Sequence, residues 1–238
     1  MSALPRVLIL AGGKGTRLGP VLGGLPKPMA MVGGRPFLAH LIERLEAAGF
    51  TEVTLSLGYQ ADCIVRHFGA RHGGVALRHV TEPSALGTGG AIALALAGQG
   101  GAPWLVMNGD TCFDIDYHAF IACWRARPAH LAIALTELAD CSRYGRVVVR
   151  AGEVVDFAEK QPGAAGVINA GLYLLTEDIL RPFALPPHFS FETELLQAHC
   201  AALRPSAFVA EGYFIDIGVP EDLERARSQM PLRAPGPG

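Results

Sequence analysis

A glycine-rich segment near the start of the chain carries residue types that can hold a phosphate chain. Residues 11–18 read AGGKGTRL, and glycines let backbone N–H groups approach phosphate oxygens closely. Arg17 in this segment can form two parallel hydrogen bonds with one phosphate group. Further along, Lys27 stands between two prolines, which stiffen the backbone around a second cation. This pattern predicts a binding site for a polyphosphate.

Other glycine-rich phosphate motifs fit this segment poorly. A P-loop requires GxxxxGK[ST], which the segment does not match. The dinucleotide fingerprint GxGxxG needs a glycine where this sequence has Leu18, and Gly19 comes one residue late. The predicted second strand also lacks a terminal acid for a ribose, which disfavours a nicotinamide-dependent dehydrogenase. A glycine turn without any ligand is disfavoured by the nearby Arg17 and Lys27.

Two aspartates at the ends of apolar segments predict a metal site. Asp110 follows the apolar run Trp104–Met107, and Asp216 lies in the segment Tyr213–Ile217, just before a glycine. A buried carboxylate is unfavourable unless it is paired or bound to a metal. Mg²⁺ commonly takes one or two carboxylates together with phosphate oxygens and waters. A turn-capping role is the alternative for Asp110.

Composition limits the classes of partner. The 238-residue chain has a net charge of −2, without the basic excess that is usual in nucleic-acid binders. No apolar run approaches the length of a membrane span. The five cysteines include no CxxC pair, which fits a reducing compartment. We therefore expect a cytoplasmic protein that binds neither nucleic acid nor a membrane. The sequence is compatible with a homo-oligomer.

Alternating strand and helix patterns before about residue 140 predict an α/β fold. The expected strands are Arg6–Ala11, Glu52–Ser56, Val75–His79, Trp104–Met107 and Leu131–Leu135. One helix is expected to begin at Pro36. Three further helices are expected over Asp62–Phe68, Gly90–Ala97 and Tyr117–Arg127. This order predicts a mostly parallel sheet covered on both faces, with ligands bound beyond the carboxyl ends of its strands.

The pattern changes in the second part of the chain. The expected elements are a hairpin of Arg146–Val149 and Val154–Phe157, strands at Val167–Leu175, Phe208–Ala210 and Tyr213–Ile217, a helix over Phe191–Ala201 and a last helix from Pro220. We find no linker or repeat, so we expect one domain over residues 1–230, whose halves are about 1–140 and 141–230. Residues 231–238 (PLRAPGPG) are expected to be disordered.

GGKGTRL followed by PKPM resembles the sugar nucleotidylyltransferases, and later motifs of that family recur in order over nearly the whole chain. The resemblance implies a Rossmann-like three-layer α/β/α sandwich with a mostly parallel mixed sheet, and we expect no appended C-terminal β-helix. It also implies an Mg²⁺-dependent enzyme that joins a nucleoside triphosphate to a sugar 1-phosphate and releases pyrophosphate. The first half would then bind the nucleotide and the second half the sugar phosphate.

The resemblance assigns a role to each matching residue. The catalytic residues would be Arg17, Lys27 and Asp110, and the metal ligands Asp110 and Asp216. The nucleotide-binding residues would be Ala11, Gly12, Gly13, Gly15, Thr16, Arg17, Lys27, Glu82, Gly87, Thr88, Asn108 and Gly109. The sugar-phosphate-binding residues would be Gly145, Glu159, Lys160, Asn169 and Gly171. Gln161 departs from the family pattern, in which proline follows the lysine directly. For the segment Phe189–Glu192 we expect a mainly structural role.

Glu82 favours GTP as the nucleotide. In uridylyl and thymidylyl members of the family, a glutamine often stands at this position. A carboxylate only accepts hydrogen bonds, which suits the adjacent N1–H and 2-amino donors of guanine. Several later motifs are most similar to guanylyltransferases for D-glycero-D-manno-heptose 1-phosphate, which act in surface polysaccharide synthesis. Mannose 1-phosphate guanylyltransferase, N-acetylmuramate 1-phosphate uridylyltransferase and a non-catalytic nucleotide-sugar-binding protein remain the alternatives.

Overall fold

The computed structural model describes residues 3–127, 130–158 and 163–232. The chain forms two compact units. The first consists of Met1–Ala85, Met107–Asp114 and Tyr213–Gly238, and the second of Leu86–Val106 and Ile115–Gly212. This division differs from the expected one near residue 140, because the chain passes into the second unit twice.

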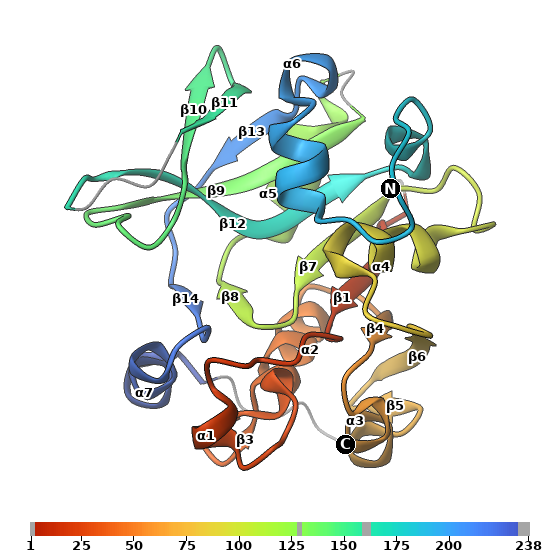
Figure 1. Cartoon of the computed structure of the whole chain (residues 1–238), viewed down its shortest axis with the longest axis vertical. Coiled ribbons are helices and arrows are strands. Elements are labelled where there is room, and N and C mark those ends of the chain that lie inside the picture. Colours follow the sequence, from red (N-terminus) through yellow and green to blue (C-terminus); the bar gives the residue numbers. More distant parts are fainter. Residues whose placement is uncertain (1–2, 128–129, 159–162, 233–238) are drawn as a thin grey trace. The chain divides into compact units, whose positions relative to one another are not determined.

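Three parallel strands form the centre of the first unit (Figure 1). Strand β4 (Glu52–Leu57) pairs in parallel with β1 (Arg6–Leu10) and with β6 (Val75–Thr81). The short β5 (Arg71–His72) pairs with β6 in the antiparallel sense, and the last two residues of β7 (Trp104–Asn108) belong to this unit. The continuous apolar runs of the sequence therefore form parallel strands, as predicted.

The other elements of the first unit surround these strands. They are α1 (Gly19–Leu22), the 3₁₀-helix η1 (Lys27–Met29), α2 (Phe37–Ala47), α3 (Ala61–Phe68) and α7 (Pro220–Gln229). Two short antiparallel ladders join β2 (Met31–Val32) to β3 (Arg35–Pro36) and β8 (Thr111–Phe113) to β14 (Phe214–Asp216). The sequence predicts α2, α3 and α7. It does not predict the ladders as such, because strands of two or three residues carry too little periodicity.

Helix α3 shows how the local sequence sets a helix. Ile64 and Phe68 lie one turn apart and are both buried, as expected for neighbours on one helical face. Asp62 lies in the first turn, whereas Arg66 and His67 lie in the last. These positions place negative charge at the positive end of the helix dipole and positive charge at its negative end.

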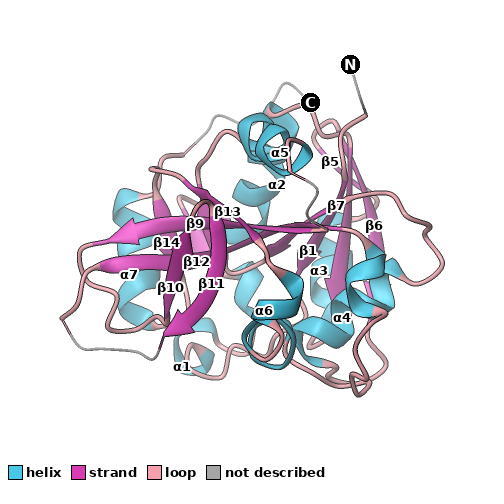
Figure 2. Ribbon diagram, turned by 90° about the horizontal axis from the view of Figure 1, so that it is seen from above, coloured by secondary structure: helices cyan, strands magenta, loops and turns pink. Residues whose placement is uncertain are grey.

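The second unit contains a mixed set of strands (Figure 2). Strand β9 (Leu131–Leu138) pairs in the antiparallel sense with β12 (Gly166–Leu175) and in parallel with β13 (Ser206–Val209). Strands β10 (Arg146–Arg150) and β11 (Glu153–Ala158) form the predicted hairpin. The helical elements are α4 (Gly87–Leu96), α5 (Tyr117–Arg125), the 3₁₀-helix η2 (Glu177–Leu180), the π-helix η3 (Phe191–Gln197) and α6 (Cys200–Leu203). Helices and a mixed sheet confirm the predicted α/β class.

Two helices differ from their predicted bounds. Helix α4 begins at Gly87 instead of Gly90. The predicted single helix over Phe191–Ala201 is a π-helix followed by the short α6. In this segment the N–H of Ala198 donates to the carbonyl of Thr193, five residues earlier. Apolar periodicity predicts that such a segment is helical, but it does not determine which hydrogen-bond pattern the helix adopts.

Part of the predicted disordered tail is in contact with the first unit. The carbonyl of Pro231 accepts a hydrogen bond of 2.7 Å from Arg44 Nη2. The side chain of Leu232 lies against Gly33, where an added Cβ would be 2.5 Å from Leu232 Cδ1. Pro231 and Leu232 therefore have contacts within the first unit, and residues 233–238 lie outside the described residues.

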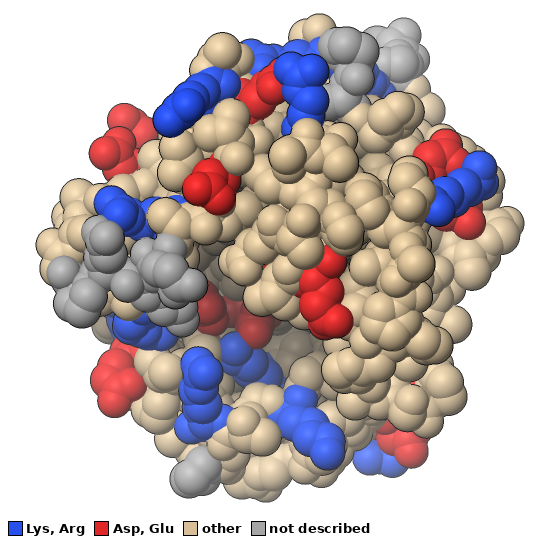
Figure 3. All heavy atoms as spheres, turned by 45° about the horizontal axis from the view of Figure 1, so that its top comes forward, with Lys and Arg blue, Asp and Glu red and all other residues tan. Residues whose placement is uncertain are grey.

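Charged side chains of both signs are interspersed on the face that Figure 3 shows. Lys and Arg lie beside Asp and Glu or are separated from one another by uncharged residues, so no continuous basic field covers this face. Among residues 3–127, 130–158 and 163–232, no helix is long and apolar enough to cross a lipid bilayer.

The turn between β10 and β11 yields a stability prediction. Ala151 and Gly152 both have positive φ, at 49° and 74°, as a two-residue type I′ turn requires. A non-glycine residue in this region costs about 1 kcal/mol, so Ala151→Gly is expected to raise Tm by about 2–4 °C. Gly152→Ala is the matched control and should lower Tm, because its Cβ would overlap the guanidinium of Arg127. Thermal unfolding measures both, and a fall in Tm for Ala151→Gly would contradict this explanation.

Candidate active site

The glycine-rich segment leaves the carboxyl end of β1 and packs against the ends of two neighbouring strands. The N–H of Ala11 donates to Ser56 O at 2.8 Å, and the N–H of Tyr59 donates to Gly12 O at 3.0 Å. A Cβ on Gly12 would overlap the carboxylate of Glu82 and lie 3.1 Å from the nitrogen of Gly58. Glycine at position 12 therefore leaves room for this close approach, and the Glu82 carboxylate lies directly over the segment.

The same segment also packs against Lys27. Gly15 has a φ of +58°, and a Cβ there would be 2.9 Å from Lys27 Cβ. Lys27 begins η1, in which Pro28 and Met29 are buried. Gly13 has open space around it, and Thr16 and Arg17 are exposed in the turn before α1. The segment thus presents backbone and Arg17 to solvent, while Gly15 lies close against the base of the Lys27 side chain.

The ammonium of Lys27 lies between the two aspartates that the sequence singles out. Lys27 Nζ is 2.5 Å from Asp110 Oδ2 and 3.7 Å from Asp216 Oδ1. The lysine side chain is 14% exposed, and the two aspartate side chains are 33% and 29% exposed. The structure therefore brings together Lys27, Asp110 and Asp216, which are far apart in the sequence.

The β8–β14 ladder explains why the two aspartates are neighbours. Asp216 is paired with Thr111, the residue after Asp110, and the N–H of Ile217 donates to Asp110 O at 2.9 Å. On the other side, Gly109 approaches β1 so closely that a Cβ would be 2.6 Å from the carbonyl of Leu10. The backbone pairing therefore brings both aspartates together, and the Thr111 hydroxyl also donates to Asp110 Oδ1 at 3.2 Å.

The donor set of this site fits a hard divalent cation. Two carboxylates supply only part of the oxygen shell that Mg²⁺ prefers, and substrate phosphates and waters usually supply the rest. Among residues 3–127, 130–158 and 163–232, no group of three His, Cys, Asp or Glu side chains could hold a metal by itself. Asp110 and Asp216 therefore suit a cation that arrives together with a phosphate ligand.

Asn108 and Glu82 add polar groups at strand ends of the first unit. Asn108 is the last residue of β7, and its Oδ1 is buried without a hydrogen-bond partner, as expected of a group that meets a ligand or a water. Glu82 follows β6, and its N–H donates to Leu57 O at 2.8 Å. The predicted nucleotide-binding residues up to Glu82, together with Asn108, Gly109 and Asp110, thus all belong to one unit.

In the second unit, Thr88 belongs to a polar network. Its hydroxyl donates to Glu192 Oε2 at 2.6 Å and accepts from the N–H of Phe191 at 2.9 Å. Gly87 has a φ of +72° and lies against the backbone of Phe189, where an added Cβ would be 2.5 Å from the carbonyl oxygen. The start of α4 is therefore joined to the start of the π-helix.

The network continues to Asn169. Glu192 Oε1 accepts from the hydroxyl of Tyr173 at 3.3 Å, and that hydroxyl accepts from Asn169 Nδ2 at 2.9 Å. Asn169 Oδ1 accepts from the N–H of Gly171 at 2.9 Å, at an irregularity in the β12–β9 pairing. The Glu192 carboxylate only accepts hydrogen bonds, so the Tyr173 hydroxyl must donate to it and accept from Asn169. The group of Asn169 that faces Tyr173 is therefore the NH2 of its amide, and the amide oxygen faces Gly171.

A comparison with protein families decides what kind of protein this is. The sequence model described as nucleotidyl transferase matches residues 6–231. The chain belongs to this family. It is 40% identical over 218 residues to the D-glycero-alpha-D-manno-heptose 1-phosphate guanylyltransferase of Campylobacter jejuni, a match that covers 91% of this chain and 96% of that protein. A protein of the same name from Aneurinibacillus thermoaerophilus is 35% identical over 223 residues, or 94% of this chain and 97% of its own.

A solved structure is similar to this nucleotidyl transferase over almost its whole length. HddC from Yersinia pseudotuberculosis is 37% identical, with a TM-score of 0.84, over 96% of this chain and 100% of the HddC chain. A second structure of HddC is a complex with GMP-PN and has a TM-score of 0.82 over the same shares of the two chains.

Sequence reasoning about this nucleotidyl transferase was incomplete in the second unit. Tyr173 was not singled out, because a tyrosine in the apolar run of β12 is typical of a core residue. For Glu192, only the mainly structural role of the segment Phe189–Glu192 was expected. Ser190 in the same segment caps the π-helix by accepting from the N–H of Thr193 at 3.2 Å. Gly145 lies near the carbonyl of Ala158, whereas Glu159 and Lys160 lie outside the described residues.

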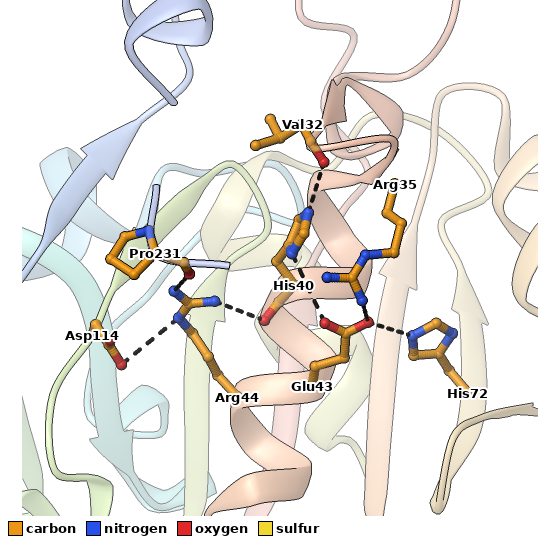
Figure 4. Close-up of polar contacts among 8 residues, drawn as sticks. All are labelled: Val32, Arg35, His40, Glu43, Arg44, His72, Asp114 and Pro231. Atoms are coloured by element: carbon orange, nitrogen blue, oxygen red, sulfur yellow. Dashed lines mark hydrogen bonds and ion pairs between the residues drawn. The ribbon is translucent and has the colours of Figure 1, made fainter. Parts of the chain in front are cut away.

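A second polar cluster of this nucleotidyl transferase surrounds α2 (Figure 4). Glu43 is nearly fully buried and pairs with Arg35, and it lies 3.4 Å from His72 Nε2. The ring of His40 is fully buried, and its Nε2 is 2.9 Å from Val32 O. Burial lowers the pKa of His40, although the hydrogen bond to Val32 acts in the opposite sense. This half of the cluster therefore ties α2 to β2, β3 and β5.

Arg44 forms the other half of the cluster and reaches β8. It is 1% exposed, donates to Pro231 O at 2.7 Å, and its Nε is 3.7 Å from Asp114 Oδ1. Asp114 directly follows β8, and its N–H donates to Tyr213 O at 2.9 Å. Arg44 thus connects α2 both to the β8–β14 ladder, next to which Asp110 lies, and to the chain after α7 (Figure 4).

Arg44→Met is expected to destabilise the protein. The change leaves Asp114 and the Pro231 carbonyl without this donor, which costs about 3 kcal/mol, or a fall in Tm of about 6–12 °C. Arg66→Met on α3 removes an exposed arginine and should change stability by no more than about 0.5 kcal/mol. Thermal unfolding of both variants measures the difference, and equal Tm values would show that the buried contacts of Arg44 contribute little.

Proposed function

We propose that this nucleotidyl transferase moves GMP from GTP to D-glycero-α-D-manno-heptose 1-phosphate, giving GDP-heptose and pyrophosphate. The observation that carries the proposal is the grouping of the glycine-rich segment, Lys27, Asp110 and Asp216 in one unit, with Glu82 over the segment. The similar guanylyltransferase from C. jejuni and the HddC complex with GMP-PN support the choice of base and sugar.

The proposed reaction needs no protein nucleophile and no general base. The attacking atom is an anionic oxygen of the sugar phosphate, which displaces pyrophosphate from the α-phosphorus in line, so the P–O bond to the sugar phosphate forms as the bond to pyrophosphate breaks. The protein then contributes alignment and neutralisation of charge. Mg²⁺ held by Asp110 and Asp216 would supply part of that neutralisation.

Individual residues have separate tasks in this proposal. The backbone of residues 12–15 and the guanidinium of Arg17 bind the triphosphate and stabilise the leaving pyrophosphate. Lys27 and Lys160 hold the reacting phosphates. Glu82 accepts from the N1–H and 2-amino groups of guanine. In the second unit, Asn169 and Gly171 bind sugar hydroxyls, with Gly145 and Glu159 as further contacts and Gly87 and Thr88 as further nucleotide contacts.

Finer features of the family belong to the same proposal. Both units work as one catalytic domain over residues 1–230, in a three-layer α/β/α arrangement. The cation is Mg²⁺, and the enzyme works in the cytoplasm, where GTP is made. The product would serve surface polysaccharide synthesis.

A panel of substrates tests the proposal. Pyrophosphate release is measured with Mg²⁺ and each of GTP, UTP, CTP, ATP and dTTP, in combination with heptose 1-phosphate and mannose 1-phosphate. Release with GTP and heptose 1-phosphate is the expected result. Preference for mannose 1-phosphate or for UTP would move the assignment to mannose 1-phosphate guanylyltransferase or to a uridylyltransferase, and no release with any pair would favour a non-catalytic binding protein.

Tyr173→Phe tests whether the second-unit network orients the sugar contact. Loss of the hydroxyl breaks the hydrogen bonds of Tyr173 to Asn169 and Glu192, while the ring keeps its packing against Phe191. The KM for the sugar 1-phosphate is expected to rise about tenfold, with the KM for GTP unchanged. Tyr117→Phe, at the start of α5 in the same unit, is the control. A rise in the KM for GTP alone would contradict a role in sugar binding.

A further inference from the structure

Lys27 holds the position between Asp110 and Asp216 that a divalent cation bound by the same pair would take. Its Nζ is 2.5 Å from one carboxylate and 3.7 Å from the other. Two carboxylates held next to each other by a backbone ladder repel, and a nearby positive charge relieves that repulsion. An ammonium and a metal ion cannot both occupy this position, so each must exclude the other.

The base of the Lys27 side chain is fixed at the glycine-rich segment. Gly15 lies so close to Lys27 that a Cβ on Gly15 would be 2.9 Å from Lys27 Cβ. Pro28 and Met29, which follow Lys27 in η1, are buried. The outer methylenes and the ammonium can adopt other rotamers from this base, since a lysine side chain has several rotatable bonds. Lys27 can therefore reach the two carboxylates, and it can also reach phosphates bound by the neighbouring glycine-rich segment.

We propose that Lys27 is an exchangeable counter-ion that keeps divalent cations off Asp110 and Asp216 until a nucleotide binds. The triphosphate attracts the ammonium toward the glycine-rich segment and brings the divalent cation to the vacated carboxylates. This inference rests on the proposed function for the identity of the nucleotide, but the competition between Lys27 and the cation does not depend on turnover. Lys27 thereby makes metal binding depend on nucleotide binding.

The inference predicts effects of opposite sign for one substitution. Lys27→Met removes a phosphate contact, so transfer activity falls. The same change removes the competing charge beside Asp110 and Asp216, so the affinity of the nucleotide-free protein for a divalent cation rises about tenfold or more. A residue with only a structural role, or with a phosphate contact alone, would not raise metal affinity when it is removed.

Direct binding of Mn²⁺ to the nucleotide-free protein tests this inference. The EPR signal of free Mn²⁺ measures its dissociation constant for the wild type, Lys27→Met and Lys27→Gln, with thermal unfolding as the check that each variant is folded. Lys14→Met is the matched control, because Lys14 is an exposed lysine of the same glycine-rich segment. Tighter binding to both Lys27 variants than to the wild type and the Lys14 variant is the expected result. Equal or weaker binding would overturn the inference.

A double variant shows where the additional Mn²⁺ binds. Asp110→Asn in the Lys27→Met background should abolish the gain in affinity for Mn²⁺. A gain that persists would overturn the inference by placing the cation elsewhere.

Failure of the proposed function would give a different experimental result. If wild-type protein releases no pyrophosphate from any nucleotide and sugar phosphate, the transfer reaction is wrong, whereas the Mn²⁺ result still decides the competition at Asp110 and Asp216.

Discussion

Asp110→Asn is expected to lower kcat for pyrophosphate release by about a thousandfold or more, because the metal and the aligned phosphates supply several kcal/mol of transition-state stabilisation. The substitution keeps the size of the side chain and its place after β7. It removes one of the two negative charges beside Lys27, which a divalent cation would also use as ligands. Asp216→Asn should have an effect of similar size, because the β8–β14 ladder holds both carboxylates at one position.

Asp116→Asn is the control for the loss of an aspartate charge. Asp116 accepts from the N–H groups of His118 and Ala119 at the start of α5, and asparagine caps helices about as well as aspartate. Its steady-state activity should equal that of the wild type. Full activity of Asp110→Asn at ordinary Mg²⁺ concentrations would refute the assignment of the metal site.

Glu82→Gln is expected to lower kcat/KM for GTP by about a hundredfold, since an amide cannot accept from two adjacent donors and leaves one of them unpaired. The glutamine offers one donor and one acceptor, which suits uracil, so kcat/KM for UTP should rise. The position of the carboxylate over Gly12 places this change at the glycine-rich segment.

The ratio of kcat/KM for GTP to that for UTP measures this effect directly. Glu52→Gln is the control, because Glu52 is an exposed residue of β4 that pairs with Arg78 at 3.0 Å. Its GTP-to-UTP ratio should match that of the wild type. An unchanged ratio in Glu82→Gln would show that Glu82 does not select the base.

For the first unit, the sequence predicted the candidate site residues better than the contacts between them. The apolar runs of β1 and β4, the glycines, Lys27 and both aspartates were recognisable from residue type and position. The ion pairs of Lys27 with Asp110 and Asp216 were not, because they depend on a ladder of three-residue strands that leaves little periodic signal. The sequence pattern indicates that Lys27 binds an anionic group. Which anionic group it pairs with, a phosphate or a carboxylate of the protein, depends on tertiary structure.

The second unit was less predictable for a related reason. Asn169 was recognised by its family motif, but the network through Tyr173 to Glu192 was not. A tyrosine in an apolar strand and a glutamate in the first turn of a helix are both common for structural reasons. Their joint role appears only when β12 and the π-helix are side by side, which no local pattern indicates.

The sequence does not predict the cluster around α2 either. Arg44 lies on the helix that was predicted to begin at Pro36, and an arginine on a helix is typical of an exposed position. The structure instead buries it against Pro231 and near Asp114. This contact joins Pro231, just beyond α7, to the buried side chain of Arg44 on α2.

The formation of GDP-heptose tests the central claim most directly. Wild-type protein is incubated with GTP, D-glycero-α-D-manno-heptose 1-phosphate and Mg²⁺, and pyrophosphate and sugar nucleotide are quantified together. The proposed reaction predicts that the two products form in equal amounts, and only when all three components are present. Intact GTP, or pyrophosphate without the matching amount of GDP-heptose, would contradict it.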